Sequence, residues 1–101
     1  MDPMVARLIY RAKFVYPEGA IREMVIWELP ASSGERPHGL KYSLHYCLSD
    51  GSSVVRYDNE QGKGVHRHLA NEEEPYRFVA IETLVTDFLA HIRQVRSKGN
   101  G

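Results

Sequence analysis

Alternating apolar and polar positions dominate the first half of the chain and predict two β-hairpins. The first hairpin is predicted over residues 5–29. Its first strand has apolar residues at the even positions Leu8, Tyr10, Ala12 and Phe14, with the basic residues Arg7, Arg11 and Lys13 at odd positions. This alternation is typical of a strand with one face in water. The turn-forming sequence PEGA follows. A two-residue turn at its centre would pair Tyr10 with Trp27 and Leu8 with Leu29 on one face.

The second hairpin is predicted within residues 39–69, where Asp50-Gly51 is a typical signal for a tight type I′ turn. On the buried face this turn pairs Tyr46 with Val55 and Leu44 with Tyr57. On the other face it pairs Cys47 with Val54, His45 with Arg56, Ser43 with Asp58 and Lys41 with Glu60. A slip of one residue would place apolar side chains opposite charged ones, so the pattern specifies the register. After a polar loop, residues 65–69 have the length of a fifth strand, with His66 and His68 on the same side.

Near the C-terminus, the spacing of apolar residues changes from that of a strand to that of a helix. Apolar residues there form one stripe at helical spacing: Ile81, Leu84, Val85, Phe88, Leu89, Ile92 and Val95. The prediction is a helix over residues 80–98. The fold class is therefore α+β, in a single domain spanning residues 1–101. An antiparallel sheet of four to five strands is packed on one face by this single amphipathic helix, and the other face stays open.

Composition narrows the classes of function. Hydrophobic residues make up 43% of the chain and charged residues 26%, as in an ordinary globular protein. The 13 basic and 13 acidic residues balance, which argues against binding nucleic acid or membranes by bulk charge. A single cysteine, no long apolar run and no signal peptide together predict a cytoplasmic protein.

The predicted open face gathers residue types that can cleave RNA without a metal. His45, Arg56 and Asp58 lie on two paired strands, and His66 and His68 follow within ten residues of Asp58. Histidines move protons near neutral pH and arginine holds phosphate. We therefore expect these five to be catalytic. Phosphate contacts are expected from Lys41, Lys63 and Arg67. The alternative is an ordinary solvated sheet face, in which the same residues form cross-strand polar pairs.

A metal site is the other chemical alternative. Asp58, His66 and His68 match the pattern of two histidines and one carboxylate that binds divalent metals. No other cofactor is expected. The GKG sequence around Lys63 lacks the remaining residues of a phosphate-binding loop. Cys47 is expected to be an unreactive thiol, because nothing near it in the sequence lowers its pKa.

Three motifs in the second half of the chain resemble the TumE family of prokaryotic toxins. They are HG-x-KY at residues 38–42, RYDNE-x-GKG-x-HRH at 56–68 and EEPY at 73–76. The resemblance spans residues 38–92. It implies the toxin of a type II toxin–antitoxin system from a prokaryote, with a cognate antitoxin as its partner and RNA or the ribosome as its target.

Besides a metal-dependent hydrolase that uses Asp58, His66 and His68, two functions remain open at this point. The first is a toxin that cleaves RNA, with Arg56 holding phosphate, His66 and His68 as acid and base, and Asp58 orienting a histidine. The second is a protein without enzymatic activity that binds its antitoxin or a host target through the polar face or a sheet edge. An exposed edge strand would also allow a homodimer.

Overall fold

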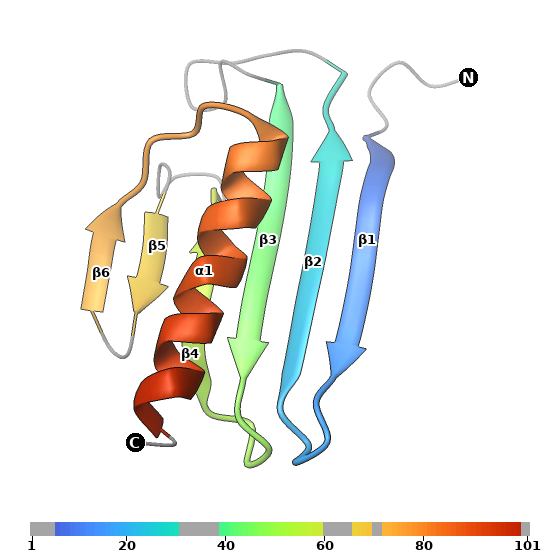
Figure 1. Cartoon of the computed structure of the whole chain (residues 1–101). Helices are drawn as coiled ribbons and strands as arrows, with labels where there is room; N and C mark the ends of the chain where they lie inside the picture. The colour runs from blue at the N-terminus through green and yellow to red at the C-terminus, as the bar shows by residue number, and fades with distance from the viewer. Residues whose placement is uncertain (1–5, 31–38, 60–65, 70–71, 100–101) are drawn as a thin grey trace.

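The computed structural model describes residues 6–30, 39–59, 66–69 and 72–99, with only the backbone described at residues 66–69 and 72–75. Its strands are β1 (Arg7–Val15), β2 (Ile21–Glu28), β3 (Leu40–Cys47), β4 (Ser53–Asp58), β5 (His66–Leu69) and β6 (Glu72–Pro75). They form one six-stranded antiparallel sheet in sequence order. The helix α1 (Ile81–Gly99) lies over one face of this sheet, so the α+β class is confirmed (Figure 1).

The sheet extends one strand beyond the predicted four to five. β6 consists of the residues EEEP, whose charges and proline hide any strand alternation in the sequence. Pairing with β5 places it at one edge of the sheet. Proline is tolerated there because one side of an edge strand needs no hydrogen-bond donor.

The core lies between α1 and the middle strands. Leu84, Phe88 and Ile92 of the helix are buried against a set from the sheet that includes Leu44 and Tyr57. The predicted apolar stripe of the helix therefore faces the sheet as expected. α1 crosses β3 and β4 and leaves β1 outside its cover (Figure 1). Within the described residues, no helix has the length and hydropathy needed to cross a membrane.

The register of the first hairpin differs from its prediction by one residue near the turn and by two at Leu8, which pairs with Trp27 rather than with Leu29. The loop has three residues rather than two, because Gly19 N–H donates to Tyr16 O and Gly19 adopts a φ of 99°. This is a type I turn followed by a glycine in the left-handed region. Tyr10 consequently pairs with Ile26 rather than with Trp27.

The second hairpin has the same loop, with Gly51 at a φ of 90° and its N–H bonded to Leu48 O. Cys47 pairs with Ser53 as a result, and the predicted pairing with Val54 is wrong. A register shift between Tyr46 and Cys47 then restores the predicted register for the rest of the ladder. The predicted pairs His45–Arg56 and Ser43–Asp58 are therefore confirmed.

Candidate functional site

Most of the predicted site residues fall in two neighbouring rows across β3, β4 and β5. One row is His45, Arg56 and His68, and the other is Ser43, Asp58 and His66. Directly paired residues of an antiparallel sheet occupy the same face, and neighbouring strands are about 4.8 Å apart. Both rows belong to the face opposite α1, because the alternate positions Leu44 and Tyr57 are buried in the core.

Arg56 and Asp58 form an ion pair at the centre of these rows. The Arg56 Nε lies 2.8 Å from the Asp58 Oδ2, and Asp58 is only 6% exposed while Arg56 is exposed. In the described part of the chain, the terminal nitrogens of Arg56 have no other partner. The carboxylate thus fixes the guanidinium and leaves its outer edge available to a second anion, which suits a phosphate.

A small hollow of about 90 Å³ lies beside this ion pair. It is lined by Lys41, Tyr42, Ser43, Arg56 and Asp58. The Lys41 side chain is exposed and provides a second positive charge at the hollow. The predicted phosphate-contacting residue Lys63 lies outside the described residues.

His45 is held in place by two neighbours on the open face. Its Nε2 lies 2.7 Å from the Ser53 Oγ and 3.3 Å from the Cys47 Sγ. Burial and the positive charge of Arg56 lower the pKa of His45 below its usual value, although Glu23 and Asp58 oppose that effect. The ring is consequently neutral near pH 7 and able to accept a proton.

Cys47 has the properties of an unreactive thiol. Burial and the negative charge of Glu23 raise the pKa of Cys47, so the thiol stays protonated near neutral pH. Ser53, which bonds His45, was not among the predicted site residues. Its contact with His45 could not be predicted, because glycine at position 51 fits both the predicted two-residue turn and the observed three-residue loop.

The remaining predicted residues are placed by the backbone alone. The register sets His66 opposite Asp58 and His68 opposite Arg56, whereas Arg67 pairs with Tyr57, at a position of the helix-facing side. Among the residues whose side chains are described, no cluster of three metal-ligating groups occurs. The side chains of His66 and His68 are outside that set, so a metal site with Asp58 stays a prediction.

Asn59 is a further residue of this region that the sequence did not single out. Its side chain is buried, and the Oδ1 accepts the Tyr42 N–H at 2.9 Å while the Nδ2 donates to Leu40 O at 2.8 Å. The amide continues the β3–β4 ladder past the last paired residue, Asp58. It therefore positions the chain at the point where the ion pair with Arg56 is made.

Comparison with known proteins gives one match. The family model described as Toxin TumE matches residues 4–96, which is nearly the whole chain. No curated protein and no solved structure matches the chain.

Proposed function

Because the chain belongs to the TumE family of toxins, we propose that it inhibits growth by cleaving RNA, without a metal, on the open face of its sheet. The observation that carries this proposal is the row in which Arg56 lies between His45 and His68. A phosphate held by Arg56 would have one histidine position on each side. Each position is one strand spacing, about 5 Å, from the arginine.

Such a row supplies the groups that phosphodiester cleavage requires. His45 is neutral near pH 7 and would take the proton of the ribose 2′-hydroxyl. The 2′-oxygen would then attack phosphorus, and the bond to the 5′-oxygen would break. His68 would protonate that leaving oxygen. The products are a 2′,3′-cyclic phosphate and a 5′-hydroxyl, and Arg56 would stabilise the charge that develops on the phosphorane.

The neighbouring row would support these groups. Asp58 would hold Arg56 through the ion pair seen at 2.8 Å, and it would also be close enough to orient His66, its partner in the register. Lys41, at the same hollow, would contact an adjacent phosphate as a point charge. A target in RNA or the translation machinery would place the action of this toxin in the cytoplasm.

The test is cleavage of an end-labelled RNA by the purified protein and by the variants Arg56→Gln, His45→Gln and His68→Gln. Each is expected to lose about 100-fold or more in rate, which is the usual contribution of an acid, a base or a charge-stabilising donor. Arg11→Gln removes an exposed positive charge from the same face, two strands from Ser43, and should keep the wild-type rate. Wild-type rates in all three site variants would refute the mechanism.

Product chemistry and a chelator separate this mechanism from the metal-dependent alternative. Fragments ending in a 2′,3′-cyclic phosphate, formed at an unchanged rate in EDTA, are the expected result. A rate that falls in EDTA and recovers with Zn²⁺ or Mn²⁺ would instead identify a hydrolase that uses Asp58, His66 and His68 as metal ligands.

A second candidate function, binding without catalysis, is favoured by the edge strand β1. It is nine residues long, and it exposes the apolar side chains Leu8, Ile9, Tyr10, Phe14 and Val15. A long apolar edge is a template for an added strand. The opposite edge, β6, has four residues and ends at a proline, which limits such pairing. We assign β1 to the cognate antitoxin that membership of a toxin family suggests.

Charge substitutions on β1 test this assignment. Ile9→Lys with Val15→Lys should weaken antitoxin binding about tenfold or more, because both exposed apolar side chains would become charged. Val79→Lys is the matched control, since Val79 is 68% exposed and lies outside the edge. The assignment would be refuted if the Ile9→Lys, Val15→Lys double variant kept the wild-type affinity for the antitoxin and only Val79→Lys lost affinity. A change in mass from dimer to monomer in the double variant alone would show that a second copy occupies the edge.

A further inference from the structure

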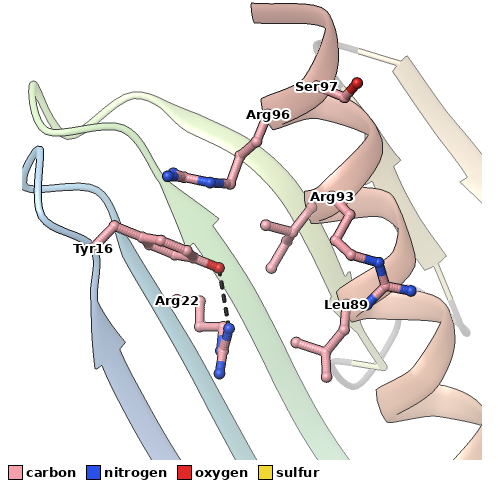
Figure 2. A pocket seen from close by; sticks show the side chains of 7 residues that line it. Tyr16, Arg22, Leu89, Arg93, Arg96 and Ser97 are labelled. Carbon is pink, nitrogen blue, oxygen red and sulfur yellow. Dashed lines mark hydrogen bonds between the residues drawn. The ribbon is translucent and has the colours of Figure 1, made fainter. Parts of the chain in front are cut away.

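A second cationic hollow lies on the helix side of the sheet, where the C-terminal half of α1 faces the β1–β2 hairpin. Its volume is about 490 Å³. The charged and polar lining comes from Arg22, Arg93, Arg96 and Tyr16, and Leu89 and Ile92 supply the apolar part. Figure 2 shows Arg22 reaching into this space from the sheet, with Arg93 and Arg96 extending from the helix.

Arg22 occupies a position that the strand pattern would give to an apolar residue. It continues the buried face of β2 after Ile26 and Met24. Its guanidinium lies 4.8 Å from the centre of the Phe14 ring and donates from Nη1 to the Tyr16 hydroxyl at 3.1 Å. The Arg22 Nε is shielded from solvent and has no hydrogen-bond acceptor among the described residues. A shielded donor of this kind is costly, so the chain keeps an arginine at this position at a cost in stability.

Arg96 is held rigidly on the other side of the hollow. It stacks at 3.9 Å over the Tyr16 ring and donates to the Tyr46 hydroxyl at 3.0 Å. Two further bonds go to the carboxylate of Glu18, which neutralises one positive charge. Among the residues that the structure describes, no carboxylate lines the hollow, so the charges of Arg22 and Arg93 are left beside it.

The helix itself explains only part of this arrangement. Basic residues near a helix C-terminus interact favourably with its dipole, which accounts for Arg93 and Arg96. The interaction with the helix dipole does not account for Arg22, because this residue lies on β2. Arg22, Arg93 and Arg96 line one hollow from two different elements, and helix stability does not account for the strand residue among them.

We propose that this hollow binds the terminal phosphate of a nucleotide, either free or at the end of an RNA strand. A phosphate monoester is close to dianionic near pH 7 and has three acceptor oxygens, which matches several guanidinium groups. A lone carboxylate is satisfied by a single guanidinium fork. The volume falls within the range of small-molecule sites, and Leu89 and Ile92 offer apolar surface to a base or ribose.

This site is separate from the one proposed for cleavage. Arg22 pairs in register with Tyr46, whose side chain is buried on the helix side, whereas His45 and Arg56 belong to the open side. The inference does not rest on the proposed cleavage activity, and each can fail without the other.

Calorimetric titration with AMP and with adenosine tests the phosphate requirement. AMP should bind at least about tenfold more tightly than adenosine. Arg22→Gln and Arg93→Gln should each weaken AMP binding about tenfold, and Arg77→Gln, an exposed arginine outside the lining, should not. Arg93 is exposed, so its variant keeps the fold and the test does not depend on Arg22→Gln alone.

A labelled RNA with a 5′-phosphate, compared with the same RNA carrying a 5′-hydroxyl, separates the two sources of the phosphate. Tighter binding of the phosphorylated strand than of the 5′-hydroxyl strand assigns the hollow to RNA ends, and equal binding of the two strands, with AMP still bound at the hollow, assigns it to free nucleotides. Equal affinity for AMP and adenosine, or AMP affinity unchanged in both arginine variants, would overturn the proposal. Displacement of AMP by a glutamate-rich peptide at similar concentration would also overturn it, in favour of an acidic protein segment.

Discussion

Replacing Asn59 by alanine should remove a structural element that the β3–β4 ladder depends on. The residue is 2% exposed, and its amide bonds two backbone groups of β3, the Tyr42 N–H and the Leu40 carbonyl. Alanine can make neither bond. Both buried backbone groups would lose the partner that Asn59 provides, so the substitution should cost stability.

The size of the effect follows from the two bonds. Removing one partner of a buried hydrogen bond costs about 1–3 kcal/mol, because the remaining group was desolvated on folding. Two such bonds give an expected loss of about 2–6 kcal/mol in the free energy of unfolding for Asn59→Ala. That is a large share of the roughly 5–15 kcal/mol typical of a small domain. For a chain of this size it lowers the Tm by on the order of 10 °C or more.

Urea unfolding followed by the fluorescence of Trp27, the only tryptophan, measures this loss. Gln94→Ala is the control, since it removes an exposed amide from the helix. Asn59→Asp separates the two bonds. Its carboxylate still accepts from Tyr42 but repels the Leu40 carbonyl, and burial raises its pKa. Its deficit should therefore grow as the pH rises above about 4. An unfolding free energy of Asn59→Ala within about 0.5 kcal/mol of that of Gln94→Ala would refute the reasoning.

Three further outcomes are expected. The folded-state pKa of His45 is lowered by burial and by Arg56, so the stability it contributes is present above about pH 6.5 and is lost as the pH falls through the folded value. Denaturation of His45→Gln should show a weaker loss of stability between about pH 7.5 and pH 5 than wild type. Gly19→Ala should cost more stability than Gly51→Ala. Both glycines have a positive φ, but only the methyl group added at position 19 meets a neighbouring atom, the Ser49 Cβ at 3.1 Å. Equal melting temperatures of the two variants would contradict this. Cys47 should react with iodoacetamide more slowly than glutathione at neutral pH, since its pKa is raised.

The sequence predicts the fold well where one regular spacing of apolar residues, that of a helix or that of a strand, extends over many residues. The apolar stripe from Ile81 to Val95 predicts the helix to within a residue of its observed bounds. Alternation from Leu40 onward likewise predicts the register of β3 and β4 over its long central part. Both patterns hold because a shifted register or face would bury charged groups.

The errors in the predicted elements come from features that the spacing of apolar residues does not encode. Gly19 and Gly51 were consistent with turns of two or three residues, and the choice between them moves a register by one. Strand β6 was missed because its composition is acidic, and it forms only by pairing with β5. Asn59 was missed because its role depends on the two β3 backbone groups that lie beside it in the folded chain.

The sequence predicts the candidate site only as far as it predicts the register of the two strands, β3 and β4, that carry it. The pairing of His45 with Arg56 follows from alternation and is confirmed. The ion pair between Arg56 and Asp58 follows from strand geometry as well, because residues two apart lie on the same face. The hollow between α1 and the first hairpin could not be predicted, because Arg22 lies far in the sequence from Arg93 and Arg96 and comes to the same hollow only through the packing of the helix.

The position of the open site sets a requirement for how an antitoxin would block it. A strand added to β1 would lie three strand spacings from β3, or about 15 Å from His45. Strand addition alone would therefore leave Arg56 accessible to RNA. The surface between them is formed on β2 by the half-buried side chains Val25 and Trp27, which belong to the open face. An antitoxin that blocks cleavage directly must then continue across this apolar surface, and Trp27→Ala should relieve inhibition of cleavage more than it weakens binding at the β1 edge.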